Sequence, residues 1–160
     1  MEKSRSLRSA LESALPEFRR EPDRLRMWVE DGAAQHRQTA TLAFAFRYRL
    51  NVLLVECATD LALVALPLFR WLRVNQPDLL APGRDGFTFD ADILDNKTAD
   101  VLIQLELTDC VTVSPLEDGG WSLDYLPEPD PMFPDFDPPG GLGEIANLSD
   151  VVTDTSQDGG

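Results

Sequence analysis

Residues 42–54 alternate between apolar and polar side chains more strongly than any other part of the chain. Because successive side chains of a β-strand point to opposite faces of a sheet, this period of two predicts a long strand with one apolar and one polar face. Arg47, Arg49 and Asn51 would lie on the polar face. The apolar face would be formed by Leu42, Phe44, Phe46, Tyr48, Leu50, Val52 and Leu54.

Four other stretches add strands to this one. Residues 25–29 alternate until Asp31-Gly32 interrupts the pattern, which predicts a hairpin with the long strand and a long, mobile tip at about residues 32–39. Residues 86–93 alternate again, and residues 101–113 do so as well. Asp118-Gly119-Gly120 is a hairpin signal ahead of a short strand at residues 121–126.

Two helices are predicted by apolar residues at helical spacing. The first would be capped by Ser4 or Ser6. The second would begin at Thr59 or Asp60, and Pro67 would either kink it or begin a shorter helix. The order α-β-β-α-β-β-β fits an α+β domain over residues 1–126, in which two helices pack on a small antiparallel or mixed sheet of about five strands.

The stretch RWLRVNQPDLL at residues 70–80 contains the end of the second helix. Leu68, Trp71 and Leu72 fall on its apolar stripe, so we interpret Trp71 as a core residue. Arg70 and Arg73 fall outside the stripe. The Asn-Gln-Pro-Asp run stops the helix, because proline disfavours the helical conformation of the residue before it.

Exposed arginines are the main candidates for subunit contacts. Arg47 and Arg49 share the polar face of the long strand, and Arg70 and Arg73 lie on the second helix. A guanidinium pairs well with carboxylates across an interface. The alternative is that these arginines are only solvated, because exposed ion pairs contribute only about 0–1 kcal/mol each.

Charge is distributed unevenly along the chain. The net charge is −14, and residues 98–160 hold 14 acidic residues and no basic ones, whereas residues 1–97 are neutral overall. Sequence-specific binding of nucleic acid is not expected, because phosphate contacts need Lys and Arg. A neutral body with exposed arginines joined to an acidic segment instead suits head-to-tail association of identical subunits, which can close into a ring.

Residues 127–160 form a proline-rich acidic tail whose composition differs from that of the domain before it. In isolation, such a segment buries too little apolar surface to offset its ordering entropy. Met132, Phe133 and Phe136 are spaced along it like the anchors of a docking peptide. The alternative is a tail that only increases solubility.

Catalysis, cofactors and membrane insertion are not predicted. His36 is the only histidine, and it falls in the first hairpin. Asp90 and Asp92 could suggest a metal site or a carboxylate hydrolase, but they lack the glycine of a calcium loop, and a solvated strand face explains them. Two cysteines without a Cys-x-x-Cys motif predict no disulfide framework or zinc site. The most apolar run, residues 61–69, is too short to span a membrane.

Several blocks, in the right order over residues 5–126, resemble the tail completion protein R family of contractile-tailed phages. The matching residues are Leu7-Arg8-x-Ala10-Leu11, Leu25–Val29, Arg47-Tyr48-x-Leu50-Asn51-Val52, Trp71-Leu72-Arg73-x-Asn75-Gln76-Pro77-Asp78 and Gly86-Phe87-Thr88-Phe89-x-Ala91-Asp92-Ile93. The resemblance adds Asn75 and Gln76 to the candidate contact residues.

The resemblance implies a structural protein with a tail-terminator-like fold. Such a protein would cap the tail tube and sheath as a ring, most simply a homo-hexamer, at the head-proximal end of the virion tail. Its partners would be its own copies, the tube protein, the sheath protein and the head–tail connector or neck proteins, with DNA passing through the lumen. Assembly would take place in the host bacterial cytoplasm. Two alternatives remain open: the same role in a headless contractile bacteriocin, and an acidic adaptor or DNA-mimic inhibitor.

Overall fold

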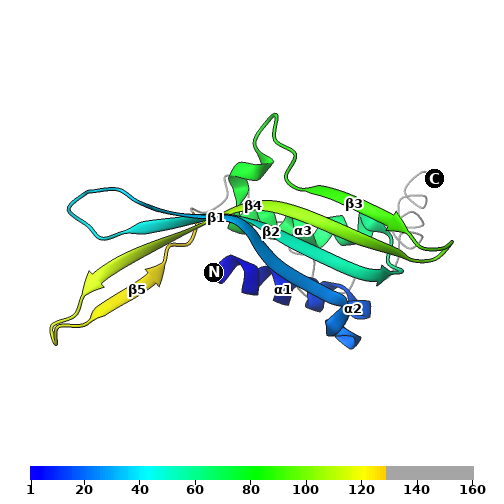
Figure 1. Ribbon diagram of the computed structural model, residues 1–160, viewed down its shortest axis with the longest axis horizontal. Helices are drawn as coiled ribbons and strands as arrows, with labels where there is room; N and C mark the ends of the chain where they lie inside the picture. Colours follow the sequence, from blue (N-terminus) through cyan, green and yellow to red (C-terminus); the bar gives the residue numbers. More distant parts are fainter. Residues whose placement is uncertain (129–160) are drawn as a thin grey trace, which may run out of the picture.

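The computed structural model describes residues 1–128, so the tail candidates Met132, Phe133 and Phe136 lie outside the described residues. Five strands and three α-helices make up the described chain (Figure 1). The helices are α1 (Glu2–Ala14), α2 (Pro16–Arg20) and α3 (Leu61–Asn75), with short 3-10 turns at Pro22–Arg24 and Pro77–Leu80. The strands are β1 (Leu25–His36), β2 (Phe44–Cys57), β3 (Thr88–Ile93), β4 (Ala99–Pro115) and β5 (Trp121–Tyr125).

One antiparallel sheet contains all five strands. The strand order is β1-β2-β4-β3, and β5 pairs with the second half of β4. β3 pairs with the first half of β4, so the two short strands extend the sheet at opposite ends of that long strand. This arrangement confirms the predicted α+β class.

The register places the predicted apolar side chains on a single face. One row across the sheet joins Leu25, Leu54 and Val101, and a row further along joins Tyr48 and Leu107. α1 and α3 cover this face and complete the core, in which Trp71 is only 6% exposed. The fully buried members include Leu7, Leu11, Phe18, Leu50, Val52, Leu54, Leu68, Leu72, Ile103 and Leu107. The core role predicted for Trp71 is therefore confirmed.

The first hairpin differs from the prediction at its tip. β1 does not end at Asp31-Gly32 but continues to His36, with an irregularity between Glu30 and Ala33 that leaves Asp31 at a positive φ of 51°. A bulge of this kind adds a residue to one strand while pairing continues on both sides. The pattern break thus marked a bulge and not the start of the turn, which lies at residues 37–43.

The helix starts also differ in part. α1 begins at Glu2 without a side-chain cap, and the Ser4 hydroxyl donates instead to the Met1 carbonyl, so the predicted cap at Ser4 or Ser6 was wrong. Asp60 does cap α3, since its carboxylate accepts from the Ala62 amide at 2.8 Å. Pro67 lies inside a continuous 15-residue α3.

A carboxylate fixes the connection between β2 and α3. Glu17 of α2 accepts from the Ala58 and Thr59 amides and from the Thr59 hydroxyl, and it forms a 2.6 Å ion pair with Arg24. Burial raises the pKa of Glu17, but the hydrogen bonds from Ala58, Thr59 and Arg24 outweigh it, so the pKa lies below its ordinary value. The ionised form of Glu17 is therefore the one that stabilises the fold.

The sheet is longer than the helices that cover it. β4 has 17 residues, which correspond to roughly 56 Å at about 3.3 Å per residue. α3 has 15 residues, which correspond to roughly 22 Å at about 1.5 Å per residue. As a result, the β1–β2 and β4–β5 hairpins project beyond the helices at one end of the molecule (Figure 1). We call this projection, residues 31–47 and 109–126, the arm.

Candidate assembly surface

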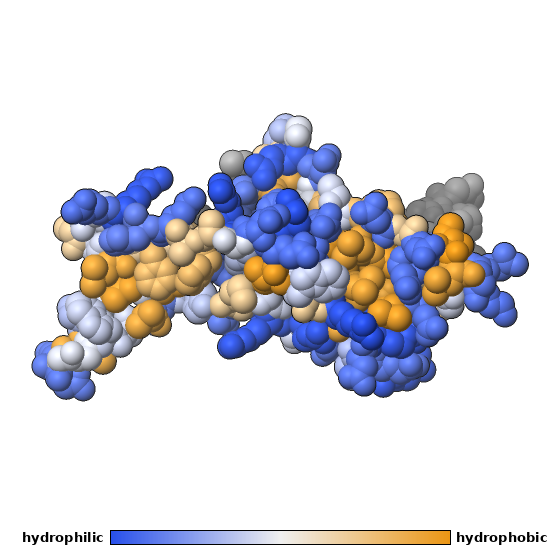
Figure 2. Space-filling model, in the orientation of Figure 1, coloured by the Kyte–Doolittle hydropathy of each residue, from blue (hydrophilic) through white to orange (hydrophobic). Residues whose placement is uncertain are grey.

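The arm has one apolar and one polar face. On the face that continues the core, the register aligns His36, Phe44, Val111 and Tyr125 in one row and Val113 with Leu123 in the next. Hydrophobic side chains gather over the arm in the space-filling view (Figure 2). The opposite face carries Ala45, Cys110, Thr112, Ser114, Ser122 and Asp124.

Towards its tip, the apolar face of the arm is open to solvent. Leu42, Trp121 and Leu123 are 50%, 56% and 58% exposed, whereas the residues that continue the same face towards the helices are buried. Phe44 and Phe46 contact each other edge-to-face, with ring centroids 5.4 Å apart. A contiguous exposed apolar face on a folded domain marks a surface for association.

A buried lysine joins the arm to the body. The Lys3 ammonium is 2.8 Å from Gln76 Oε1, 2.6 Å from the Thr108 carbonyl and 2.7 Å from Glu128 Oε1. All three of its donors are thus used, and they join α1, the end of α3, β4 and the last described residue. Because Thr108 immediately precedes the arm, this network fixes where β4 leaves the body.

A second polar pair lies at the same junction. The Tyr48 hydroxyl donates to Asp109 Oδ2 at 2.7 Å, and both residues are 2% exposed. Burial, followed by the hydrogen bond to Asp109, raises the pKa of Tyr48, so the phenol stays protonated and remains a donor. Nearby, the Met1 ammonium donates to the Tyr125 hydroxyl at 2.6 Å. The first of these contacts joins β2 to β4 at the base of the arm, and the second joins β5 to the start of α1.

The two strand arginines lie on the polar face, as predicted, but in different surroundings. Arg49 donates to Glu106 at 2.9 Å and to Asp31 at 2.7 Å, so its guanidinium pairs with carboxylates of its own chain. The hydrogen bond to Glu106 is the main reason that the pKa of Arg49 is raised. Arg47 is exposed at the base of the arm, where its Cα pairs with that of Thr108.

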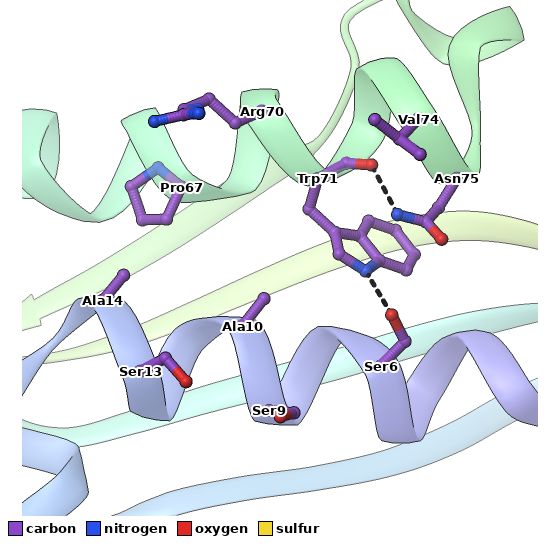
Figure 3. A pocket seen from close by; sticks show the side chains of 10 residues that line it. All are labelled: Ser6, Ser9, Ala10, Ser13, Ala14, Pro67, Arg70, Trp71, Val74 and Asn75. Atoms are coloured by element: carbon purple, nitrogen blue, oxygen red, sulfur yellow. Dashed lines mark hydrogen bonds between the residues drawn. The ribbon is translucent and has the colours of Figure 1, made fainter. Parts of the chain in front are cut away.

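A groove runs between α1 and α3 (Figure 3). Its volume is about 610 Å³, and its α1 side is formed by small residues: Ser6, Ser9, Ala10, Ser13 and Ala14. Pro67, Arg70, Trp71, Val74 and Asn75 of α3 form the other side. The Trp71 indole donates to the Ser6 hydroxyl at 3.0 Å, and the Asn75 amide donates to the Trp71 carbonyl at 2.9 Å. Two of the predicted contact residues, Arg70 and Asn75, therefore line one concave surface.

The remaining two candidates, Arg73 and Gln76, lie outside that groove. Arg73 is a partly exposed residue in the last turn of α3. Gln76 is only 4% exposed, and its amide oxygen accepts from Lys3 and from the Thr108 amide at 3.0 Å, while its amide nitrogen donates to Asp78. Gln76 therefore links α1, β4 and the turn after α3 within one subunit. A role in subunit contacts stays a prediction for all six residues.

The contacts that Lys3, Tyr48 and Asp109 make at the base of the arm were not predicted from the sequence. Asp109 had a visible signal, because it interrupts the inward-facing series Leu105, Leu107 and Val111 of β4 with a carboxylate. A buried acid at such a position must have a partner. Lys3 had no comparable signal, because its partners lie 73 to 125 residues away.

His36, Asp90 and Asp92 lie on different strands and do not form a common site. His36 lies at the end of β1, where its Nδ1 is 3.0 Å from the Ala43 carbonyl. Asp90 and Asp92 are exposed on the polar face of β3. Within residues 1–128, no group of three His, Cys, Asp or Glu side chains is placed to hold a metal ion. In the same range, no helix has the length and apolarity needed to cross a membrane.

Comparison with known proteins places this architecture in a family. The model of the P2 phage tail completion protein R (GpR) family matches residues 1–129, and so includes every helix and strand described above. The tail completion protein R of Escherichia phage P2 is 38% identical over 137 residues, which cover 84% of this chain and 88% of the relative. No solved structure matches the chain. The chain therefore belongs to the P2 phage tail completion protein R family.

Proposed function

We propose that this protein terminates a contractile phage tail. It binds the finished tail tube and sheath as a ring of identical subunits, most simply a hexamer, stops their growth and presents a docking surface to the head or neck. Its partners are its own copies, the tube protein, the sheath protein and the head–tail connector. It acts at the head-proximal end of the tail, and DNA passes through the ring lumen.

Family membership is the observation that carries this proposal. The family consists of structural proteins that complete phage tails, and the match extends over the helical body, the junction network and the arm. A protein that completes a tail has to recognise the end of a polymer. It therefore needs surfaces that remain open in the isolated subunit and become covered on assembly.

The arm supplies such a surface. Its apolar face continues the core face beyond the helices, and Trp121 and Leu123 are more than half exposed. Burying apolar area stabilises an association by roughly 25 cal/mol per Å² before entropic costs are subtracted. An isolated subunit gains nothing from these residues, whereas a subunit in a ring or on a tube does.

Deletion of the gene, followed by electron microscopy of tails, tests the proposal. The expected result is tails of irregular, extended length that fail to join heads, and restoration of both properties when the gene is supplied from a plasmid. Tails of normal length that join heads normally in the deletion strain would refute it. An antibody label on purified wild-type tails provides an independent check, since the label is expected at the head-proximal end alone.

A further inference from the structure

We propose that the β4–β5 hairpin of one subunit docks in the groove between α1 and α3 of a second subunit. This inference rests on the proposed ring and names the two surfaces that form it. The observations that carry it are the open apolar face of the hairpin, the shape of the groove and the opposite charges of the two surfaces.

The hairpin presents apolar side chains that its own chain leaves uncovered. Trp121 and Leu123 of β5 are 56% and 58% exposed, and Leu116 in the turn before β5 and Leu126 directly after β5 are 46% and 55% exposed. Val113 aligns with Leu123, so the two-stranded end of the arm has a continuous apolar side. Large apolar and aromatic side chains of this kind act as anchors when they enter a pocket on a partner.

The groove has the form needed to accept such anchors. Ala10 and Ala14 point from α1 towards α3, and their small side chains leave space between the two helices (Figure 3). Pro67 and Val74 provide apolar contacts on the α3 side, and the exposed Ser9 and Ser13 form an open rim. The resulting volume of about 610 Å³ can hold more than one large side chain.

Charge favours this pairing over other contacts between copies. Residues 110–126 contain three acidic residues, Glu117, Asp118 and Asp124, and no basic residue. The three helices contain seven basic and three acidic residues, a net charge of +4 that is unchanged when the internally paired Lys3 and Glu17 are left out, and the charged residue that lines the groove is Arg70. Two hairpins, or two helical surfaces, would repel each other, whereas a hairpin and a helical surface attract each other.

The two surfaces belong to different parts of the subunit. The hairpin projects at the end of the sheet beyond the helices (Figure 1), whereas the groove is lined by residues of α1 and α3. A contact between unlike surfaces leaves one free hairpin and one free groove on every dimer. Such a contact propagates, and it closes into a ring when the rotation between neighbours permits.

Two single substitutions test the two surfaces separately. Leu123→Asp places a charge on the hairpin, and Ser13→Trp fills the groove at an exposed position of α1. Each variant is expected to weaken self-association on the order of thirty-fold, the loss typical of an interface hot spot. Ile93→Asp on β3, 77% exposed, and Ser114→Trp on the polar face of the arm are matched controls that should associate as wild type does.

Mixing the two impaired variants gives the most specific result. The Ser13→Trp subunit keeps its hairpin, and the Leu123→Asp subunit keeps its groove, so an equimolar mixture can form one intact interface. Native mass spectrometry of the full-length chains should therefore show a 1:1 heterodimer and no ring, whereas each variant alone stays monomeric. Circular dichroism and thermal melts of each variant establish that the monomers are folded.

Several outcomes would overturn the proposal. The proposal is overturned if the wild-type protein stays monomeric both alone and on purified tail tubes. It is also overturned if either variant forms rings as stable as those of the wild type. If Leu123→Asp forms normal rings that no longer bind tubes, the hairpin binds the tube protein instead. When gene deletion disrupts tails but both variants restore them, the proposed function stands and this interface is wrong. When deletion itself has no effect, the proposed function fails as well.

Discussion

Removing the Tyr48 hydroxyl is expected to destabilise the protein by about 2–3 kcal/mol, the cost of leaving a buried carboxylate without its donor. The Tyr48–Asp109 hydrogen bond is 2.7 Å long, and both residues are only 2% exposed, so water cannot replace the phenol. Tyr48→Phe keeps the ring and its packing, which isolates the hydrogen bond. Urea denaturation at pH 7, followed by tryptophan fluorescence, measures the change as a shift of the midpoint at constant slope.

A double-mutant cycle separates the Tyr48–Asp109 hydrogen bond from the other effects of each substitution. Asp109→Leu removes the carboxylate and extends the apolar series of β4, so the double variant should be less destabilised than the sum of the two single variants by at least about 1 kcal/mol. Tyr125→Phe is the matched control, because the Tyr125 hydroxyl is bonded to Met1 at the surface, and its loss should cost less than about 0.5 kcal/mol. Additive effects within roughly 0.3 kcal/mol would refute the coupling of Tyr48 with Asp109.

Three further predictions concern the body of the fold. The pKa of Glu17 is lowered in the folded state, so Glu17 contributes stability that is present above the ordinary pKa of a glutamate and is lost as the pH falls through the lower folded value. Glu17→Gln should therefore flatten the acid side of the pH dependence when the free energy of unfolding is measured from pH 7 to 3. Gly86→Ala should cost at least about 1–2 kcal/mol in a thermal melt, because φ is +77° and the added Cβ would lie 3.2 Å from a ring carbon of Phe69. At Gly83, φ is +83° but the space is open, so Gly83→Ala should cost only the backbone strain. Equal losses at the two positions would contradict the proposed clash with Phe69. Asp60→Ala should cost about 1 kcal/mol through loss of the α3 cap, while Ser4→Ala changes stability by less than about 0.5 kcal/mol; the reverse order would contradict the cap assignment.

The strands and their faces could be predicted because the alternation of side chains records burial directly. Every inward residue predicted from Tyr48 to Leu54 of β2 is buried, and α3 contains the predicted core residue Trp71. The start of α3 could likewise be narrowed to Thr59 or Asp60, because a cap such as Asp60 acts on an amide only two residues away. Such features depend on neighbours in sequence, and a local pattern contains all the information they need.

Features that depend on distant partners could not be predicted in this way. The bulge after Glu30 looks in sequence like the end of a strand, because only the register with β2 reveals that pairing continues. The resemblance made Gln76 a candidate contact residue, yet its amide oxygen accepts from Lys3 and from the Thr108 amide of its own chain. In the same way, Arg49 was expected to face another subunit, and the cross-strand acid Glu106 is the partner that the structure shows.

The alternation in β2 predicts more than a strand, because it continues into the arm, where no helix covers the apolar face. The core face needs apolar residues only as far as the helices reach, and Tyr48 with Asp109 already forms a polar boundary there. Nevertheless, the partly buried Phe44 and Phe46 continue the apolar series beyond that boundary. On the neighbouring strands the series continues from the buried Val111 through the partly buried Val113 to the exposed Leu123 and Trp121 at the tip. Exposed apolar side chains contribute little to the stability of a monomer and favour unwanted association. Their regular placement on a single face, with polar residues on the other, is therefore best explained by a surface that assembly covers.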